Sequence, residues 1–478
     1  MNPTSLSTSL PTSLKLRRSR KLRRSRKLRG TRNWQDDRND FEIEGGGKLS
    51  GFITTNASKN GATHLFAAAL VNRGQTTLHN IPRIEEVNRF IEVFKSLSVK
   101  VVWIGKHTLT IKPPKTFSVS RINPRSTGKI RSALMLIGPL SARLKSFKLP
   151  HIGGCKMGER TIAAHRYALE DLGLKIVTKE NYYHISRGSS TKLGASRTKK
   201  EVVMYEASDT GTTNAILRAA VLPQRTVIDF AQQNYMVLEV CHLLEKLGIK
   251  IDGIGTKTLT ILGNPDIRKN VEYSNSEDPI EAMLFITAAI MTRSKLIIKR
   301  APIDFLKVEL LKLEKMGLRY DISKTYLSLN GHTKLVDLTI KPSKLKALHD
   351  KIHAQPYPGI NTDNLPFFVP IATQAIGTTL IHDWMWEDRA VFFTELNRLG
   401  ATVRLADPHR VFIDGPTRLK GAQIICPPAL RPAVMLLVAM LGAEGKSILR
   451  NVYAIKRGYE NIVGRLNKIG AKIKILKS

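Results

Sequence analysis

The chain has 478 residues, of which 42% are hydrophobic and 24% are charged. This composition is typical of a folded globular protein and argues against disorder throughout the chain. The longest apolar stretch, residues 432–441, is shorter than the roughly 20 residues that cross a bilayer, so the sequence predicts no membrane association. Three widely spaced cysteines cannot build a disulfide framework, and they favour a reducing, cytoplasmic compartment.

The net charge of +37 is divided unevenly along the chain. Residues 1–38 hold 12 Lys and Arg against 2 Asp and Glu, so they carry +10, and the remaining residues carry +27. The body of the protein is therefore strongly basic in its own right. Nucleic acid and small phosphorylated substrates are both partners that such a charge would attract, and charge alone does not choose between them.

Residues 1–40 are predicted to be a basic, disordered extension. They contain the tandem KLRRSR-KLRRSR-KLRG and have no acidic residue before Asp36. A block of like charge cannot build a core and stays solvated. Its Arg-rich, Ser-rich composition overlaps that of an organelle transit peptide, so targeting and polyanion binding both remain open, as does an over-long start. We expect nucleic acid to bind, if at all, only through this extension.

From residue 41 onward the chain repeats a helix that ends in a Leu-x-x-Leu-Gly type of turn and is followed by a β-branched strand. Glycine just beyond the last helical turn is expected in the left-handed conformation. The six copies place this residue at intervals of 69 to 83, at Ser98, Gly173, Gly248, Gly317, Gly400 and Gly470. Units of this size are too long for a solenoid, and six of them predict two similar three-unit domains with a ligand cleft between them.

Ionisable and polar residues recur at the predicted starts of helices. A helix N-terminus offers unpaired N–H groups and a positive dipole end, which suit a phosphate or a carboxylate. One such residue alone is more typical of a solvated surface, but their recurrence predicts an anion-binding cleft. The residues are Lys59, Asn60, Arg131, Arg160, Asp363, Arg431 and Arg457.

The segment His151-Ile-Gly-Gly-Cys155-Lys-Met-Gly-Glu-Arg160 predicts a reactive thiol. A cysteine among three glycines is not typical of core packing, and Lys156 and Arg160 would lower the pKa of the thiol. Such a thiol can act as a nucleophile or as a proton donor. His165, one turn after Arg160, either reaches the same site or is a structural histidine. The sequence has no metal-binding motif, so we expect neither a metal nor a cofactor.

Several motifs together resemble those of a known family. The chain from residue 41 to 478 resembles the enolpyruvyl transferases, and most of all the branch that uses UDP-N-acetylglucosamine and carries a Gly-Gly-Cys-x-x-Gly-x-Arg loop. The resemblance implies an α/β fold of two inside-out α/β domains, each built from three βαβαββ repeats, with a cleft between them. It places one domain at 59–276 and the other at 41–58 plus 277–478. The matching motifs, in chain order, are ASKNGATHLFAAAL, KIRSALMLIGPLSAR, GGCKMGER, YPGINTD, WEDR, ALRPA and IKRGYE.

The resemblance also implies an activity. The enolpyruvyl group of phosphoenolpyruvate would be transferred to the 3-hydroxyl of UDP-N-acetylglucosamine by addition and elimination, with release of phosphate. This is the first committed step of peptidoglycan precursor synthesis, and it would link the protein to cell-wall formation, cell shape and division. We expect a monomer whose partners are these two small substrates.

The family's functional residues carry over by position in the motifs. Cys155 would protonate the methylene carbon of phosphoenolpyruvate or form an adduct with it, and Asp363 would take the proton of the sugar hydroxyl. Lys59 and Arg457 would be catalytic as well. The residues expected to bind phosphoenolpyruvate are Lys59, Arg160, Arg389, Arg431 and Arg457, and those expected to bind UDP-N-acetylglucosamine are Asn60, Arg131, Arg160, His165 and Asp363.

Three positions depart from the family pattern, and they concern the acceptor side more than the phosphoenolpyruvate side. Ala429 stands where the family has Asp, Pro279 where it has Arg, and Ala163 where an acid is expected near the uracil. Two alternatives therefore remain beside the activity above. One is an enolpyruvyl transferase with a different sugar or nucleotide acceptor, and the other is a catalytically weak paralogue that binds polyanions.

Overall fold

The computed structural model describes residues 39–477 apart from 120–121, 154–160 and 189–198. These residues belong to one compact unit, Arg38–Ser478. The predicted basic extension lies outside the described residues except for Asn39 and Asp40, which belong to the first strand, so its predicted end at residue 40 is wrong by two residues. The predicted site residues Cys155 and Arg160 also lie outside the described residues and stay predictions. No helix among the described residues is long and apolar enough to cross a membrane.

The described elements between residues 59 and 274 form three sheets and a set of helices. The first sheet has the order β13 (Val271–Ser274), β3 (Thr76–His79), β5 (Leu109–Lys112) and β4 (Lys100–Trp103). The second has the order β11 (Lys250–Asp252), β12 (Thr258–Leu262), β10 (Arg225–Asp229) and β9 (Glu201–Val203), and the third β6 (Ser146–Pro150), β8 (Tyr182–Arg187) and β7 (Leu174–Thr178). The helices are α1 (Lys59–Ala69), α2 (Glu85–Ser96), α3 (Pro124–Thr127), η2 (Arg131–Leu136), α4 (Ile137–Ser141), α5 (Ala163–Asp171), α6 (Asp209–Ala219) and α7 (Tyr235–Lys246).

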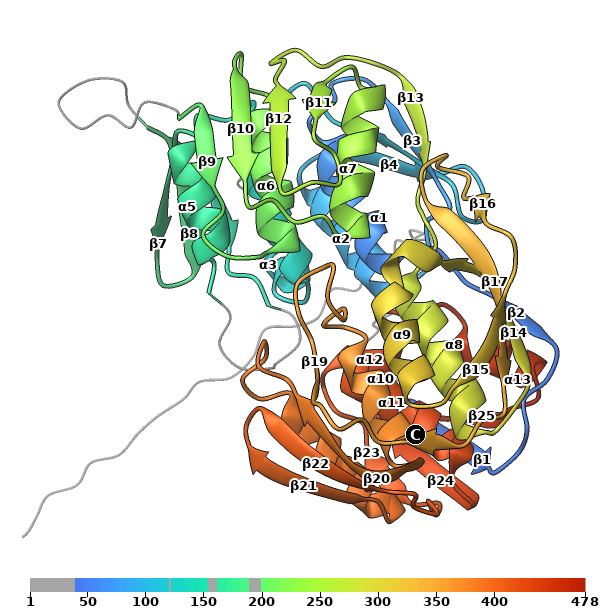
Figure 1. The fold of residues 1–478 in the computed structure, drawn as a ribbon. Helices are drawn as coiled ribbons and strands as arrows, with labels where there is room; N and C mark the ends of the chain where they lie inside the picture. The colour runs from blue at the N-terminus through green and yellow to red at the C-terminus, as the bar shows by residue number, and fades with distance from the viewer. Residues whose placement is uncertain (1–38, 120–121, 154–160, 189–198, 478) are drawn as a thin grey trace, which may run out of the picture. The chain divides into compact units, whose positions relative to one another are not determined.

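The remaining elements form three further sheets (Figure 1). One sheet has the order β15 (Arg319–Ile322), β17 (Lys334–Lys341), β14 (Leu296–Pro302) and β2 (Phe52–Thr54), with β16 (Tyr326–Leu327) on β17. Another sheet has the order β18 (Leu345–Lys346), β20 (Ala375–His382), β22 (Arg410–Gly415) and β21 (Thr402–Asp407), with β19 (Ile352–His353) on β20. The last sheet has the order β23 (Gln423–Ile425), β24 (Gly445–Arg450), β1 (Asn39–Gly45) and β25 (Lys472–Lys477). Their helices are α8 (Pro279–Met291), η3 (Ile303–Phe305), α9 (Lys307–Lys315), α10 (Leu365–Ala372), η4 (Ala390–Leu399), α11 (Leu430–Gly442), α12 (Tyr453–Lys456) and α13 (Ile462–Lys468).

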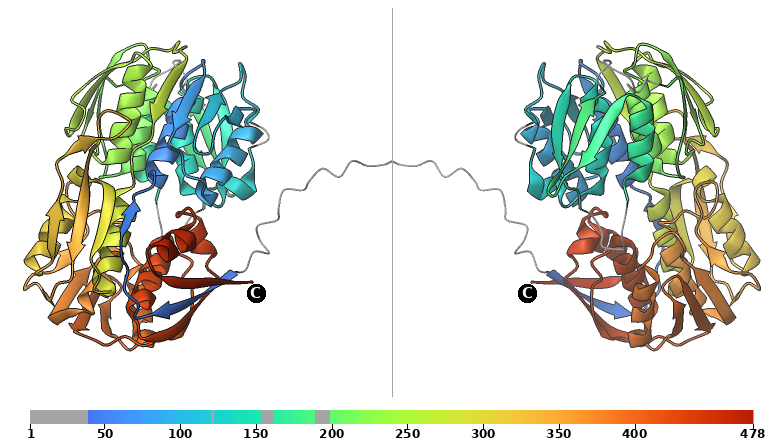
Figure 2. Two further views of the ribbon diagram at one scale, coloured as in Figure 1. Left: turned by 90° about the vertical axis from the view of Figure 1, so that its right-hand side faces the viewer. Right: turned by 90° about the vertical axis from the view of Figure 1, so that its left-hand side faces the viewer.

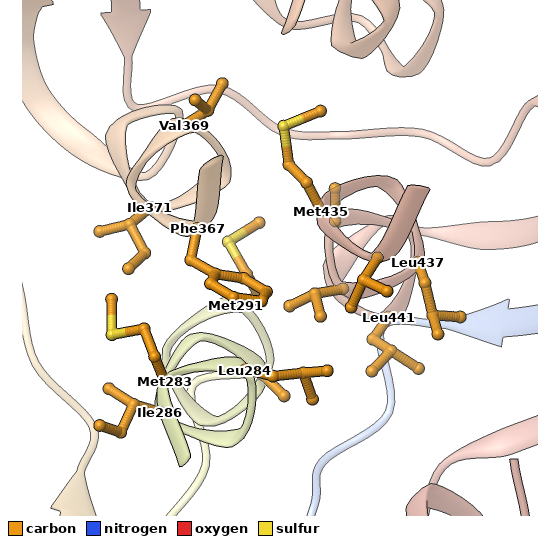
Figure 3. Packing of buried hydrophobic residues seen from close by; sticks show 14 of the residues in the cluster. Met283, Leu284, Ile286, Met291, Phe367, Val369, Ile371, Met435, Leu437 and Leu441 are labelled. Atoms are coloured by element: carbon orange, nitrogen blue, oxygen red, sulfur yellow. The ribbon is translucent and has the colours of Figure 1, made fainter. Parts of the chain in front are cut away.

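Helices occupy the middle of this second set, which is the inside-out arrangement. Helices α8, α10 and α11 are buried on nearly every side and pack against one another. A helix that is apolar all round belongs in the interior. In Figure 3, Met291 of α8 and Phe367 of α10 point into the space between the helices, beside Leu441 of α11. The protein therefore has the predicted α/β fold, with sheets outside and helices inside.

The repeat signature is confirmed at every copy. All six residues at the helix ends have positive φ, from +64° at Ser98 to +105° at Gly470. Glycine adopts this conformation without the steric conflict that a Cβ atom introduces, which explains its presence at five of the six positions. Ser98 is the exception and adopts the same conformation as a serine.

The chain passes twice between two buried cores. One core takes its residues from 62–273 together with Phe305, and the other from 41–53 and 280–473. The two connections run side by side, because Ser58 N donates to Ser276 O at 2.8 Å and Asp278 N donates to Asn56 O at 2.8 Å. The domain boundaries predicted from the sequence fall in these connections and remain a prediction.

A second junction between the two cores lies at α7. Asn330, in the turn before β17, donates from Nδ2 to Glu239 Oε1 at 2.7 Å. The rings of His242 and His332 stack beside it with centroids 3.6 Å apart. Glu239 is buried, and burial raises its pKa to about 8 in spite of the hydrogen bonds from its neighbours. The carboxyl group is thus protonated near neutral pH.

Candidate active site

A cavity of about 590 Å³ lies among segments that contribute to both cores. Its wall combines the starts of α1, α6 and α11 with the residues before α10. Clefts of this kind are where small-molecule sites are commonly found. The described site residues that line it are Lys59, Asn60, Arg131, His165, Asp363, Arg431 and Arg457.

The start of α1 sets the positions of Lys59 and Asn60. Ser58 is the N-cap, and its side chain accepts a hydrogen bond from Gly61 N at 2.9 Å. A Cβ atom at Gly61 would lie only 2.3 Å from Asn275 Oδ1, so the close approach requires glycine. Asn275 in turn donates to Ser58 O at 2.8 Å. The first turn of α1 is therefore fixed where it faces the cavity.

Asp363 and Arg431 form an ion pair on the cavity wall. Arg431 Nη2 donates to Asp363 Oδ2 at 3.0 Å, and Nη1 donates to the Tyr459 hydroxyl at 2.6 Å. Asn60 Nδ2 also lies 3.5 Å from Asp363 Oδ2. Burial by itself would raise the pKa of Asp363, but the charges of Arg431 and Lys59 outweigh burial and hold this pKa well below its usual range. Asp363 is therefore ionised at physiological pH.

Arg389 is placed differently from the other predicted cations. Its side chain is fully buried and donates from Nη2 to Asp383 Oδ1 at 2.8 Å. It does not line the cavity, although its charge contributes to lowering the pKa of Asp363. Its Nη1 has no hydrogen-bond partner among the described residues. Asp383 therefore accepts hydrogen bonds from Nε and Nη2 of this guanidinium but not from Nη1.

Arg457 connects the end of α12 to the first core. Its Nη2 donates to Glu86 Oε2 at 3.1 Å and to Lys129 O at 3.2 Å. Glu86 also lines the cavity, and both side chains are largely buried. A buried arginine held by two acceptors presents its charge in a fixed direction, as an anion site requires.

His165 faces the cavity in a defined tautomer. Asn214 Nδ2 lies 3.1 Å from His165 Nδ1, and the same amide accepts from Gly138 N at 2.7 Å through its oxygen. Because the amide nitrogen can only donate, Nδ1 accepts, and Nε2 donates to the Thr210 hydroxyl at 3.1 Å. His64, on the neighbouring wall, is uncharged because burial and then Lys59 and His165 lower its pKa to about 3.

Arg131 starts η2 and contacts the segment that leads into α5. Its Nη2 donates to Thr161 O at 2.6 Å, and burial lowers its pKa while leaving it protonated at any physiological pH. Glu206 lies near enough to oppose this shift. Arg131 and Glu206 both line the cavity, as His165 does.

The structure adds residues that the sequence did not single out. Glu206 and Asp209 bring carboxylates to the cavity, and Trp384 and Trp386 bring indole rings. Asp209 is the first residue of α6, directly after the capping Ser208, so in the sequence it reads as an ordinary helix start. Trp386 is the first residue of the WEDR motif that also holds Arg389, so the sequence did contain a signal for this residue.

The three departures from the family pattern all lie at helix starts. Ala429 is the buried N-cap of α11, and Ala163 is the first residue of α5; neither helix has a side-chain cap. Pro279 is the first residue of α8, where Asp278 caps Ile280 N. The described residues include no group of three or more His, Cys, Asp or Glu side chains arranged to hold a metal ion.

Comparison with known proteins identifies the class. The family model described as EPSP synthase (3-phosphoshikimate 1-carboxyvinyltransferase) matches residues 43–466. A UDP-N-acetylglucosamine 1-carboxyvinyltransferase from Treponema denticola is 34% identical over 91% of this chain and 99% of its own length. One from Bradyrhizobium diazoefficiens is also 34% identical, over 90% of this chain and 97% of its own.

Solved structures agree on the fold. The enolpyruvyl transferase NikO from Streptomyces tendae superposes with a TM-score of 0.78 at 24% identity, over 92% of this chain and all of its own. An EPSP synthase from Acinetobacter baumannii gives a TM-score of 0.70 at 16% identity, with 92% of this chain and all of its own covered. With a fold of two triplicated halves and a cavity lined by cations, the protein is an enolpyruvyl transferase by class. The chain belongs to the EPSP synthase family.

Proposed function

We propose that the protein transfers the enolpyruvyl group of phosphoenolpyruvate to the 3-hydroxyl of UDP-N-acetylglucosamine and releases phosphate. The observation that carries this proposal is the meeting of Lys59, Asp363 and Arg431 on one cavity wall. Relatives that bear the name of this activity, at 34% identity over nearly their full length, support the choice of acceptor. The predicted part in peptidoglycan synthesis and the cytoplasmic location rest on this activity and stay predictions.

In this proposal cations bind phosphoenolpyruvate. Lys59, Arg431 and Arg457 line the cavity, and Arg389 and Arg160 complete the set expected from the family motifs. Fixed cations in an enclosed site stabilise developing negative charge more strongly than water does, because they need no reorganisation during the reaction. The partners of Arg431 and Arg457 hold these guanidinium groups in place before the substrate arrives.

The chemistry is an addition followed by an elimination. The 3-hydroxyl oxygen bonds to the central carbon of phosphoenolpyruvate while Asp363 takes its proton and Cys155 gives a proton to the methylene carbon. In the elimination the bond from this carbon to the phosphate oxygen breaks, one proton of the methyl group returns to the Cys155 thiolate, and the leaving phosphate takes the proton held by Asp363. Phosphate departs and the enol ether remains, so atoms and charges balance.

Phosphoenolpyruvate binding would prepare Asp363 for its part. In the free protein Arg431 and Lys59 hold the pKa of this carboxylate so low that it is a weak base. A bound phosphate and carboxylate would share these two cations and reduce their pull on Asp363. The pKa of Asp363 would then rise, so the carboxylate would become a better proton acceptor only when phosphoenolpyruvate is bound.

A different acceptor is the second candidate. It is favoured by the carboxylates Glu206 and Asp209 on the cavity wall and by Ala163 in place of an acid. A nucleotide brings phosphates of its own, and these would be repelled by Asp209, whose charged neighbour is Asp363, whereas Glu206 lies near Arg131. The polyanion-binding alternative accounts for the charge of +27 on the body but offers no reason for the ion pair between Asp363 and Arg431.

Phosphate release from phosphoenolpyruvate, measured with and without UDP-N-acetylglucosamine, tests the proposal. Release should require the acceptor and should fall about 100-fold or more in Asp363→Asn, because removing a general base costs this much. Cys155→Ala should also abolish it, whereas Cys155→Asp can keep activity if the residue acts mainly as an acid. Asp350→Asn, at an exposed loop position, is the matched control and should leave the rate unchanged.

Other outcomes separate the alternatives. Release with another sugar or nucleotide, and none with UDP-N-acetylglucosamine, would support the second candidate. No release with any acceptor, together with RNA binding that weakens steeply as salt rises, would support the polyanion-binding paralogue.

A further inference from the structure

The sheet of β6, β8 and β7 has one buried face and one exposed face. On the buried face, Phe147 pairs with Ile185 across the strands, and α4 and α5 pack against this sheet. The next pair along the register, Lys148 with His184, points to the opposite side. In Figure 1, β7 and β8 lie at the outer margin of the molecule. The exposed face is therefore accessible to a large ligand.

This sheet carries positive charge that ion pairs do not balance. Its strands and turns, residues 144–150 and 174–187, contain five basic residues and a single acidic one, Glu180. None of the five basic residues forms an ion pair with an acidic residue in the part of the chain that the structure describes. All five are exposed: Lys145, Lys148, Lys175, Lys179 and Arg187.

The sheet of β24, β1 and β25 is also rich in lysine, but there the charge is paired. Lys472 Nζ lies 2.7 Å from Glu44 Oε1. Lys446 and Lys474 lie 3.4 Å and 3.9 Å from the carboxylate of Glu42. Neighbouring charges of opposite sign cancel at a distance, so such a face attracts a polyanion only weakly. The lysines on the sheet of β6, β8 and β7 keep their charge available.

Two aromatic rings stand among these cations on the middle strand. Tyr182 and His184 lie on the same face of β8, two residues and about 7 Å apart along the strand. Lys148 Nζ is 4.7 Å from the centre of the Tyr182 ring, and His184 Nε2 is within hydrogen-bonding distance, 2.9 Å, of the Ser146 hydroxyl. Lysines that meet phosphates, next to rings that stack on bases, are the means by which proteins hold single-stranded nucleic acid.

Other polyanions match this face less well. A lipid surface gains from large apolar side chains that enter it, and the remaining residues on the exposed face of the strands are Ser146, Pro150, Val177 and Ser186. A nucleic-acid duplex encloses its bases, so rings on a sheet cannot stack on them. A single strand offers both phosphates and unstacked bases.

We propose that the exposed face of the sheet of β6, β8 and β7 binds single-stranded nucleic acid. Lys148, Lys175 and Lys179 contact phosphates, while Tyr182 and His184 stack against bases. The sequence predicted such binding only through the basic extension, and this face is a second, folded site. None of these five residues lines the cavity, so the proposal does not depend on the proposed function.

Fluorescence anisotropy tests the role of the lysines. A labelled oligouridine RNA of about 15 nucleotides is titrated with the full-length protein at several salt concentrations. The combined variant Lys148→Gln, Lys175→Gln and Lys179→Gln should bind about 10-fold or more weakly. The slope of log K against log salt should fall by about 2, because each phosphate contact on a single strand contributes about 0.7. An unchanged Kd and slope would overturn the proposal.

The matched control removes the same number of charges from the other lysine-rich sheet. The combined variant Lys446→Gln, Lys472→Gln and Lys474→Gln should change the Kd by less than about 3-fold and leave the slope unaltered, because these lysines are already paired. Equal losses in the two triple variants would show that only net charge matters, and they would overturn the assignment to this face.

Tyr182→Ala separates stacking from charge. It should weaken binding about 5-fold or more at every salt concentration, as expected for loss of one stacked base. The salt slope should stay the same, because a ring releases no counterions. Tyr182→Phe keeps the ring and should bind as wild type does. Duplex RNA that binds as tightly as the single strand, together with no loss in Tyr182→Ala, would overturn the proposal.

Crosslinking shows where the RNA lies, because the basic extension is present in every variant. Irradiation of the protein with RNA that contains 4-thiouridine should yield a crosslinked peptide that includes Tyr182 or His184. Crosslinks confined to residues 1–38 would overturn the proposal, as would binding to phosphatidylserine vesicles without binding to RNA. All substitutions are at exposed or half-buried positions, so thermal unfolding of the variants should match that of wild type.

Discussion

Glu239→Gln should make the protein more stable at alkaline pH while changing little at acidic pH. Glu239 is buried on α7, its Oε1 accepts from Asn330, and its Oε2 has no partner among the described residues. Burial raises its pKa from the ordinary 4.5 to about 8. Glutamine has nearly the shape of the protonated acid and does not ionise, so it preserves the neutral state at every pH.

The sign and size of the effect follow from proton binding. Between pH 4.5 and 8 the folded protein keeps a proton on Glu239 that the unfolded chain has released, so stability falls as pH rises through this window. The free energy of unfolding changes by up to about 1.4 kcal/mol for each pH unit. From pH 6 to pH 8, wild-type protein should therefore lose about 2 kcal/mol that Glu239→Gln retains.

Denaturant unfolding of both proteins at pH 6, 7 and 8 measures this difference. Other titrating groups are common to both proteins and cancel in the subtraction. Asp252→Asn removes an exposed charge on β11, and it should show no such trend. A gap between wild type and Glu239→Gln that is the same at all three pH values would refute the reasoning.

Three further predictions concern single positions. Ser98→Gly should raise the free energy of unfolding by about 1 kcal/mol. Ser98 has a φ of +64°, and the steric strain of a side chain at this φ is larger than the extra backbone entropy that glycine loses on folding. Thermal unfolding measures this, and Gly173→Ser, at a φ of +82°, should have the opposite effect; equal melting temperatures would contradict the argument. Ala429→Asp should give α11 a side-chain cap, because an Asp N-cap can accept from the N–H of Arg431 at the start of this helix. It should also raise turnover if the missing carboxylate limits the reaction, and an unchanged kcat would show that the site does not depend on it. Arg457→Lys should raise the KM for phosphoenolpyruvate roughly 10-fold, because a lysine cannot keep both acceptors of this guanidinium and still present its charge in the same direction. An unchanged KM would indicate that Arg457 serves only to hold Glu86.

The helix ends were predictable from the sequence because they depend on local rules. A glycine after the last helical turn needs no knowledge of the rest of the chain, and all six positions have positive φ. The seven described residues that line one cavity were predicted from their places at helix starts and from the family motifs. Their assigned roles, and those of Cys155 and Arg160, remain predictions.

Pairings between distant segments could not be predicted in this way. Arg431 meets Tyr459, and Glu239 meets Asn330, only because helices and turns pack in one particular register. Asp209 was missed for a related reason. An acid in the first turn of a helix is a common choice there, so the type and place of Asp209 do not reveal that its Oδ1 has no donor among the described residues.

Strand β1 has a consequence for how the protein is made. Its partners are the last strands of the chain: Phe41 pairs with Leu449 of β24 and with Ile475 of β25, and in Figure 2 the blue strand lies among the red ones. During synthesis the ribosome must add about 400 residues before β1 can enter its sheet, while the intervening core can fold first. Until then the edges of β1 stay unpaired, and this segment is where chaperone binding or misassembly during translation should concentrate.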